Sequence, residues 1–407
     1  MPTPTDPVTV TLALGAAPYQ KTLTAKLLST GMLLQVLAFV PYLEVQEPSR
    51  NGTLERVTSF PGYTLSKRVV WGVWRRLPRS VRPRPPVTSS AALADRLMAK
   101  KIARCTIFHG CTALCLASLR AAKRNGAITL VENAACHPRH WKKVEMEECR
   151  RFGVNSGDGS GNFAERLLER MDREFEECNR IVVPSVVAQE SFAEYGYGEK
   201  TVVVQTGVDS QDFSRSPAVT TASTFRVCYV GRLEFAKGVG YLLEAWKKLG
   251  LRDAELVLVG EVKPQMKSLL TKYANYGVRV TGVLPAGEVR RCYREANLFV
   301  QPSPNEGLAQ VLLEAMASGL PVVATDKAGA LECLTNGKEG LVVPARDVDA
   351  LAEAILWCYQ HREESQEMGT AARRRIEIQF TLEHYNERVV ALYRALAAGK
   401  ADLITSK

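Results

Sequence analysis

Short apolar runs alternate with amphipathic stretches along most of the chain, which predicts strands alternating with helices. The apolar runs of the first half are Val8–Leu14, Cys105–Phe108, Ile128–Glu132, Arg180–Pro184 and Val202–Gln205. Between them, helical periodicity is found near Leu23–Leu28, Cys111–Lys123 and Phe163–Cys178. Such alternation is typical of parallel sheets with helices on both faces, so we expect an α/β fold.

The alternation starts again after a polar connector, Ser214–Thr224, whose composition is that of an interdomain linker. The second series of strands is predicted at Phe225–Val230, Leu256–Val259, Val278–Thr281, Leu298–Gln301, Val322–Thr325 and Gly340–Val343, and a last helix at Leu382–Ala398. We therefore expect a Rossmann-like domain over residues 1–215, a second over 216–379 and a C-terminal helix over 380–407. A ligand is expected in the cleft between two such domains.

Length and the N-terminal region agree with this division. A chain of 407 residues exceeds one ordinary core and fits two domains. The first residues lack the basic and apolar segments of a secretory signal. Leu27–Leu43 contains Gln35 and falls short of the roughly 20 apolar residues of a spanning helix, so we interpret it as core rather than as a membrane anchor.

The ten cysteines show no C-x-x-C spacing, which indicates reduced thiols in a reducing compartment, the cytoplasm. One group of cysteines and histidines could suggest zinc: Cys105, His109, Cys111, Cys115, Cys136 and His137. Their spacings match no standard zinc site, and free cysteine is a common small core residue. We expect no metal.

Basic residues are concentrated between Lys67 and Arg104, where eleven of them face one acidic residue, Asp95. Trp71 and Trp74 are interleaved with them. This composition suits an anionic membrane surface or a phosphorylated acceptor, and equally a solvated loop and helix face. Because no nucleic-acid motif accompanies the charge, we expect no nucleic acid partner.

Two cations follow the first strand of the second domain. The strand Phe225–Val230 ends at Gly231, and Arg232 and Lys237 stand in the loop that follows. A departing diphosphate needs positioned cations in a site from which water is excluded. Two ordinary surface cations beside a turn would show the same pattern. There is no G-x-G-x-x-G motif here, which argues against a dinucleotide dehydrogenase.

An apolar segment with one narrow polar stripe follows Glu306. The pattern predicts a helix over Leu308–Ser318, and its polar positions lie on one face: Gln310, Glu314 and Ser318. Glu306 would stand at the helix N-terminus, where free amides favour an anion. Eight residues of helix span about 12 Å, so Glu306 could hold a sugar and Glu314 a ribose. An N-capping carboxylate and a partly exposed helix glutamate would also fit.

These residues carry a family resemblance. G-R-x-x-x-x-K-G around Arg232 and Lys237, with Glu306 and Glu314 as E-x7-E, resembles the retaining family 4 glycosyltransferases of the GT-B fold. Further similar segments are Ile181–Ser185, Thr206–Asp209, Gly337–Pro344, and Phe380–Thr381 with Tyr393. The similarity is dense from Ile181 to Tyr393 and thin before it. It implies two Rossmann-like βαβ domains facing across a cleft.

The resemblance also implies roles for residues. Arg232 and Lys237 would meet the donor diphosphate and Glu306 the sugar hydroxyls. The other donor-site residues would line the nucleotide: Glu314 at the ribose, Gly231, Gly307 and Leu308 near the phosphates, and Gly282 and Val283 against the base. The reaction would retain anomeric configuration and need no metal or other cofactor.

Two positions depart from the family pattern. Gly307-Leu308-Ala309 stands where the family usually has two glycines flanking an aromatic residue. The family's N-terminal domain usually ends a strand in a histidine that faces the reacting centre, whereas the comparable strand here ends in Glu132. We expect His109, predicted just after a strand, to act at the reacting centre, with Glu132 and His137 as alternatives.

The sequence thus predicts a retaining, metal-independent hexosyltransferase that transfers a sugar from a nucleotide-diphosphate sugar to a hydroxyl acceptor, in bacterial polysaccharide or glycolipid synthesis. It would be cytoplasmic or peripheral on the inner membrane face. The alternatives are a GT-B epimerase or phosphorylase, and a nucleotide-sugar-binding protein without turnover.

Overall fold

Two parallel sheets organise the protein. The computed structural model describes residues 7–14, 18–38, 57–59, 87–154, 165–213 and 224–400. The first sheet is built from β1 Val10–Leu14, β2 Leu33–Ala38, β3 Val57–Ser59, β4 Ile107–Cys111, β5 Ile128–Glu132, β6 Arg180–Val183 and β7 Thr201–Val203. The second is built from β8 Phe225–Val230, β9 Ala254–Val259, β10 Val278–Gly282, β11 Leu298–Gln301, β12 Val322–Thr325 and β13 Gly340–Val343.

The strand orders are β3-β2-β1-β4-β5-β6-β7 and β10-β9-β8-β11-β12-β13, and all pairings within these sheets are parallel. In each sheet the chain moves outward for three strands and returns to the other side of the first. The strand order therefore reverses between β1 and β4 and between β8 and β11. Ligands of open α/β sheets bind beyond the carboxyl ends of the strands at such a point.

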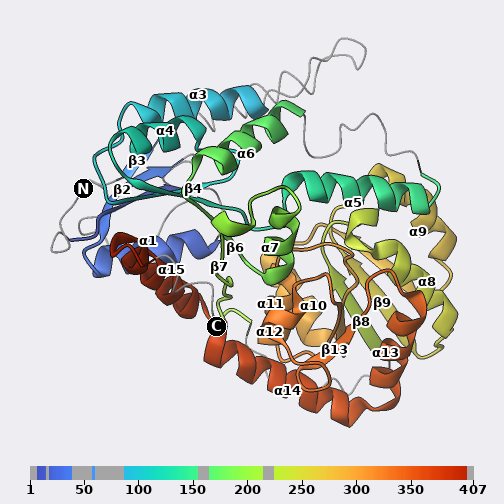
Figure 1. Cartoon of the computed structure of the whole chain (residues 1–407). Helices are drawn as coiled ribbons and strands as arrows, with labels where there is room; N and C mark the ends of the chain where they lie inside the picture. Colours follow the sequence, from blue (N-terminus) through green and yellow to red (C-terminus); the bar gives the residue numbers. More distant parts are fainter. Residues whose placement is uncertain are drawn as a thin grey trace.

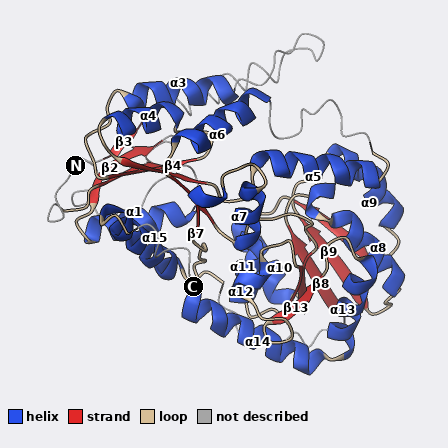
Figure 2. Ribbon diagram, in the orientation of Figure 1, coloured by secondary structure: helices blue, strands red, loops and turns tan. Residues whose placement is uncertain are grey.

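Helices cover both faces of the sheets, as Figure 2 shows for the C-terminal lobe. Those of the first half are α1 Pro18–Ser29, α3 Val87–Ala99, α4 Leu116–Arg124, α5 Pro138–Arg151, α6 Glu165–Glu177 and α7 Val186–Ala193. Those of the second half are α8 Val239–Leu249, α9 Lys267–Tyr273, α10 Ala286–Glu295, α11 Gln310–Ala317, α12 Ala330–Cys333, α13 Val348–Gln360, α14 Arg362–Gln379 and α15 Leu382–Ala397. Short 3₁₀ turns occur at η4 Gly198–Lys200, η5 Phe235–Lys237 and η6 Pro264–Met266.

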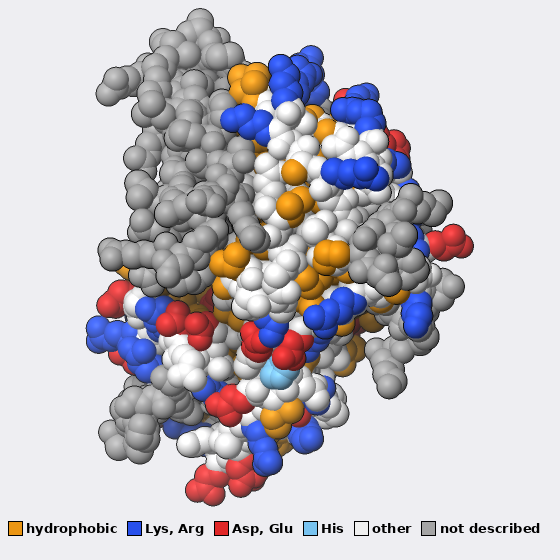
Figure 3. Space-filling model, turned by 90° about the vertical axis from the view of Figure 1, so that its left-hand side faces the viewer, with side chains coloured by type: hydrophobic (Ala, Val, Ile, Leu, Met, Phe, Trp, Pro, Cys, Tyr) orange, Lys and Arg blue, Asp and Glu red, His pale blue; other side chains and the backbone are white. Residues whose placement is uncertain are grey.

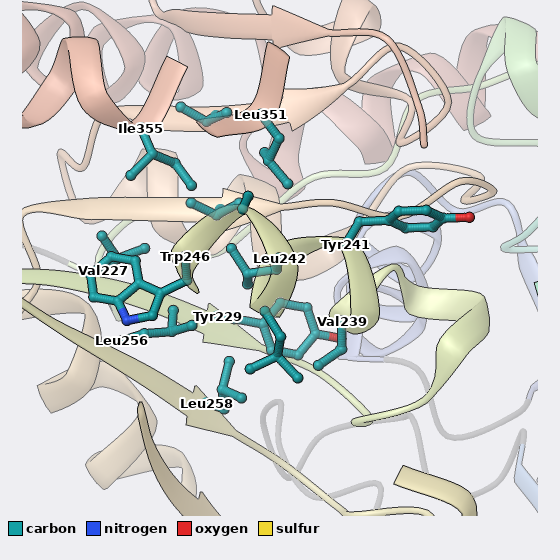
Figure 4. Packing of buried hydrophobic residues seen from close by; sticks show 14 of the residues in the cluster. Val227, Tyr229, Val239, Tyr241, Leu242, Trp246, Leu256, Leu258, Leu351 and Ile355 are labelled. Carbon is teal, nitrogen blue, oxygen red and sulfur yellow. The ribbon is translucent and has the colours of Figure 1, made fainter. Parts of the chain in front are cut away.

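Strand β8 shows why the apolar runs form central strands. Val227 and Tyr229 point into one hydrophobic cluster, and Cys228 and Val230 point into the cluster on the opposite face. A strand buried on both faces reads as a continuous apolar run, which is why it could be recognised from the sequence. Figure 4 shows Val227 and Tyr229 packed against α8 and α13 residues such as Leu242 and Ile355.

The final helix α15 returns to the N-terminal lobe, as the resemblance implied (Figure 1). Tyr385 and Tyr393 of α15 are fully buried in one cluster with Leu12 and Ile107 of the first sheet. Just before α15, the backbone amide of Val208 donates to the carbonyl of Phe380. The chain therefore returns from the C-terminal lobe to the N-terminal lobe just before α15.

Some predicted boundaries were wrong. The strand predicted at Cys105–Phe108 lies at Ile107–Cys111, so His109 is inside β4 and not in the loop behind it. The helix predicted from Cys111 begins only at Leu116, because Cys111 still pairs with Glu132 and Ala113 has a positive φ of 73°.

Other expectations fall partly outside the described residues. The connector Ser214–Thr224 is described only at Thr224, and Trp71 and Trp74 are not described. Leu33–Ala38, within the stretch interpreted as core, forms the buried strand β2. Among the residues that the structure describes, no helix is long and apolar enough to cross a membrane. All ten cysteines are free thiols, as predicted.

Candidate functional site

The predicted donor-site charges meet where the strand order of the second sheet reverses. Arg232 and Lys237 follow β8, and Glu306 follows the neighbouring strand β11. Lys237 Nζ forms an ion pair with Glu306 Oε2, and the two side chains are only 14% and 19% exposed. Arg232 Nη2 lies 3.0 Å from Oε1 of Glu234. Two cations and the predicted sugar-binding carboxylate therefore share one edge of the sheet.

Glycine at position 238 allows the two loops to approach. Its φ is +72°, and a Cβ there would lie 2.0 Å from the carbonyl oxygen of Pro302, in the loop that leads to Glu306. Only glycine combines this conformation with this contact. The short 3₁₀ turn ending at Lys237 can therefore lie against the loop that carries Glu306.

Gly307 lies at one contact between the two lobes. A Cβ on Gly307 would lie 2.9 Å from Ala135 Cα and 3.0 Å from Pro184 Cγ, both of the N-terminal lobe. Cys136, the next residue in that lobe, is also close to the ion pair: burial raises the pKa of its thiol to about 12, and the charges of Glu306 and Lys237 also act on it. The loop after β5 therefore lies close to the Lys237–Glu306 ion pair.

The helix α11 begins at Gln310, two residues later than predicted, with Ala309 at its N-cap. Because residues 306–309 are not helical, the estimate of about 12 Å from eight residues of helix rise does not apply. The predicted polar stripe is also divided. Gln310 donates to the carbonyl of Gly207, and the hydroxyl of Ser318 donates to the carbonyl of Glu314. Among the three polar residues of the predicted stripe, Glu314 is the one whose side chain could still bind a ligand.

Glu314 is a partly buried carboxylate with an unusual pKa. It accepts a hydrogen bond from the hydroxyl of Tyr293 at 3.0 Å. Burial raises its pKa to about 7, against the opposing effects of the Tyr293 hydrogen bond and the charge of Arg290. A carboxyl group with this pKa changes charge near neutral pH, and such groups gather at functional sites.

The residues predicted to contact the base lie at the end of β10. Gly282 has a φ of +74°, and its carbonyl accepts a hydrogen bond from the amide of Gly260. Val283 is 75% exposed, which leaves an apolar surface open to a planar ligand. Gly282 and Val283 therefore lie on the same edge of the sheet as Arg232 and Glu306.

His109 lies in a buried polar group on the α15 side of the first sheet. Its Nδ1 is 2.6 Å from the hydroxyl of Tyr393. Its Nε2 lies 3.8 Å from Glu132 Oε2 and has no hydrogen-bond partner among the residues that the structure describes. Glu132 Oε1 accepts a hydrogen bond from Tyr385. Burial lowers the pKa of His109 to about 4, so the imidazole is neutral at pH 7. His109 thus lies between Tyr393 of α15 and Glu132, the last residue of β5.

His137, the third alternative, is the N-cap of α5 and is fully buried. Its ring stacks on Tyr195 with centroids 4.2 Å apart, and Nδ1 accepts from the amide of Arg139. Burial lowers its pKa to about 3. These contacts are those of a structural residue that fixes the start of a helix.

Sequence reasoning missed one residue at the site. The ring of Trp141, on α5, lies 5.7 Å from the guanidinium of Arg232. The helix itself had a sequence signal: Pro138 in its first turn and apolar residues at Trp141, Val144 and Cys149. That this helix packs on the second lobe could not be read from this pattern.

The zinc alternative and the basic-surface expectation can be compared with the described part of the chain. Within it, no group of three or more His, Cys, Asp or Glu side chains could hold a metal ion. Of the basic stretch, the side chains of Arg96, Lys100, Lys101 and Arg104 are described and exposed. Figure 3 shows Lys and Arg side chains at the upper end of the face formed by the N-terminal lobe.

Two parallel sheets facing each other, with donor-type charges at a switch point, define a protein of the GT-B fold, as predicted. Solved structures agree across nearly the whole chain. Sucrose-phosphate synthase from Thermosynechococcus elongatus superposes with a TM-score of 0.68 at 19% identity, covering 96% of this chain and 100% of that one. HepE from Anabaena, solved in complex with UDP-glucose, gives 0.65 at 17% identity, covering 94% and 98%.

Residues 224–361, which lie in the C-terminal half, match the model of the family Glycosyl transferases group 1. The chain is 30% identical over 210 residues to the putative colanic acid biosynthesis glycosyltransferase WcaL of Escherichia coli, covering 49% of this chain and 52% of the relative. It is 33% identical over 187 residues to alpha-maltose-1-phosphate synthase of Mycolicibacterium smegmatis, covering 42% and 48%. The chain thus matches about half the length of these relatives, and the resemblance to family 4 glycosyltransferases is confirmed.

Proposed function

We propose that the protein is a glycosyltransferase that moves a sugar from a nucleotide-diphosphate sugar on the C-terminal domain to a hydroxyl acceptor at the N-terminal domain. The observation that carries the proposal is the Lys237–Glu306 pair at the switch point of the second sheet, with Arg232 in the adjoining loop. Cations at this place can meet the charge that develops on a departing diphosphate. The relatives named for colanic acid and capsular polysaccharide synthesis support polysaccharide assembly as the setting.

In the proposed reaction, Glu306 holds the sugar hydroxyls, and the nucleotide extends past Glu314 to Gly282 and Val283. The bond between the anomeric carbon and the diphosphate oxygen breaks, while the acceptor oxygen bonds to that carbon from the same face. Arg232 and Lys237 take up the charge of the diphosphate. The acceptor's proton passes to the departing phosphate oxygen. Gly307 lies against the N-terminal lobe, a contact that helps exclude water.

On the acceptor side, we propose that Glu132 orients the hydroxyl and that His109 acts through Glu132. Glu132 ends β5, and Tyr385 fixes one of its oxygens. His109 is neutral and held by Tyr393, so it can shape the position of Glu132 without adding charge. Retention of configuration, independence from metals and a cytoplasmic location belong to the same proposal.

The proposal is tested with a panel of UDP-, GDP- and ADP-sugars in the presence of EDTA. We expect one nucleotide class to raise the melting temperature, and the corresponding donor to release nucleoside diphosphate when a polysaccharide precursor is added. The anomeric configuration of the product is read by NMR. Donor binding without release of diphosphate would favour the non-catalytic alternative, and sugar inversion at another carbon would favour an epimerase.

The pKa of Glu314 makes donor affinity depend on pH. Only the carboxylate can accept hydrogen bonds from two ribose hydroxyls, and it protonates as the pH falls through about 7. We expect the Kd for the nucleotide-sugar to rise up to about tenfold between pH 8 and pH 6. The nucleotide-sugar is the suitable probe because its diphosphate does not titrate in this range. Glu314→Gln should bind weakly and show no such dependence; an unchanged pH profile in this variant would refute the role of Glu314.

A second element of the proposal is peripheral contact with an anionic membrane through the basic stretch Lys67–Arg104. The exposed side chains of Lys100 and Lys101 support it on the described part of the chain. Each basic residue near anionic lipid contributes about 1 kcal/mol. Sedimentation with phosphatidylglycerol vesicles should be stronger than with phosphatidylcholine vesicles, and Lys100→Glu with Lys101→Glu should reduce it; equal binding to both lipids would contradict the proposal.

A further inference from the structure

Helix α5 contacts both lobes, and it packs on the segment after β8 that carries Arg232 and Lys237. It stands between β5 and β6 of the first sheet in the sequence, yet Figure 1 shows it lying over the C-terminal lobe. Cys149 of α5 is part of the hydrophobic cluster of that lobe, and Phe152, just after the helix, packs against the same cluster. The helix therefore belongs to the N-terminal lobe by its place in the sequence, but it packs on the C-terminal lobe.

The start of α5 is fixed in the N-terminal lobe. The amide of His137 donates to the hydroxyl of Ser191 at 2.8 Å, and the ring of His137 stacks on Tyr195. Arg139 Nε donates to Asp172 of α6 at 2.8 Å. These contacts tie the first turn of α5 to α6, α7 and the turn after α7.

The end of α5 is fixed in the C-terminal lobe by a buried carboxylate. Glu148 is fully buried, and its two oxygens accept from the Tyr241 hydroxyl at 2.6 Å and from Arg346 Nε at 2.7 Å. Figure 4 shows the Tyr241 hydroxyl pointing out of the hydrophobic cluster. Separating α5 from the lobe would leave this carboxylate buried without partners or expose it, and breaking such a pair is costly.

Between these two anchors, α5 contacts the segment that carries both cations. The Trp141 ring lies 5.7 Å from the Arg232 guanidinium, within the range of a cation–π interaction. Phe152 stacks on Phe235 with centroids 4.8 Å apart, and Phe235 begins the turn that ends at Lys237. A Cβ on Gly240 would lie 2.3 Å from the Phe152 ring, so this glycine makes room for the contact.

We propose that α5 is a positioning element of the donor site. Trp141 orients Arg232, and Phe152 holds the turn that carries Lys237. The site therefore distinguishes nucleoside diphosphates from monophosphates only while the N-terminal lobe holds α5 in place. Arg232 also faces acidic groups, Glu234 in its own loop and Glu145 on α5. In this proposal, the Trp141 ring and the Glu234 carboxylate together hold the guanidinium at the edge of the sheet where the diphosphate would bind. This role rests on the proposed function.

The test measures the Kd of UDP and UMP at pH 8 by calorimetry, with the GDP/GMP and ADP/AMP pairs in parallel. Only the diphosphates reach both cations, so the ratio of the two Kd values reports their positioning. For the pair with the tighter diphosphate, Trp141→Leu should reduce the preference for the diphosphate about tenfold, with the monophosphate Kd unchanged. Trp141→Phe keeps an aromatic face and should stay within about threefold of the wild type.

Two further variants separate positioning from stability. Lys143→Ala alters an exposed side chain of the same helix and should leave the ratio unchanged. If Trp141→Leu does not fold, Tyr241→Phe takes its place. This variant keeps the ring but removes the hydroxyl that donates to Glu148, and it should reduce the ratio of the two Kd values about threefold. A wild-type ratio in the folded Trp141→Leu or Tyr241→Phe variant overturns the positioning role alone. So does a parallel loss of both affinities. A wild type that binds none of the nucleotides overturns the proposed function as well.

Discussion

Glu306→Gln and Lys237→Met should each reduce sugar transfer by about 10²–10³-fold while the protein stays folded. The two side chains form one ion pair at the carboxyl edge of the second sheet, so each positions the other before the donor arrives. Glutamine keeps the shape of Glu306 but not the charge that pairs with Lys237. Methionine keeps the length of Lys237 but not its charge for the diphosphate. Initial rates with the identified donor and the melting temperature are the measurements.

The matched control is a surface ion pair on the same lobe. Lys248 and Asp349 lie 2.6 Å apart with side chains 56% and 70% exposed, so Lys248→Met should change neither rate nor melting temperature appreciably. The double variant of Glu306 and Lys237 should lose little more than either single variant, because the two act as a unit. Turnover near the wild-type rate in either single variant would show that the donor site is elsewhere.

Gly238→Ala should abolish donor binding and lower the free energy of unfolding by several kcal/mol. The added Cβ would lie 2.0 Å from the carbonyl of Pro302, and the left-handed backbone at φ +72° disfavours alanine. The loops that carry Lys237 and Glu306 would have to move apart. Calorimetric titration with the donor and chemical denaturation measure the two effects.

Gly250→Ala separates backbone strain from the steric contact. Gly250 also has a positive φ, +56°, but a Cβ there meets nothing within 4 Å. This variant should cost about 1 kcal/mol and bind donor normally. If Gly238→Ala behaves like Gly250→Ala, the close approach of the two donor-site loops is not needed for binding.

The strands that carry the proposed donor site could be predicted because the pattern that marks them is local. Strands β8, β11 and β12 are buried on both faces and appear as continuous apolar runs. The loops after β8 and β11 carry Arg232, Lys237 and Glu306 in recognisable spacing. Because parallel strands end at the same edge of a sheet, the order of these segments along the chain was enough to bring the residues together.

Predictions near helix starts failed for a physical reason. Apolar periodicity cannot separate the last residues of a strand from the first turn of a buried helix. Cys111 was assigned to a helix although it pairs with Glu132 in the sheet, and this error moved His109 from β4 to a loop. The same ambiguity placed the start of α11 at Leu308 instead of Gln310.

By itself, the sequence determined the alternation of strands and helices and the two-domain α/β fold, and it supplied the charges of the proposed donor site, because each depends on residues close together in the chain. Only the tertiary structure decided which partners those residues have: Tyr393 for His109, Tyr385 for Glu132, and Trp141 for Arg232. These partners are separated from their targets by between 91 and 284 residues (232 − 141 for Trp141 and Arg232). The packing of α5 and α15 brings them together, and no local pattern records which surface a helix will cover.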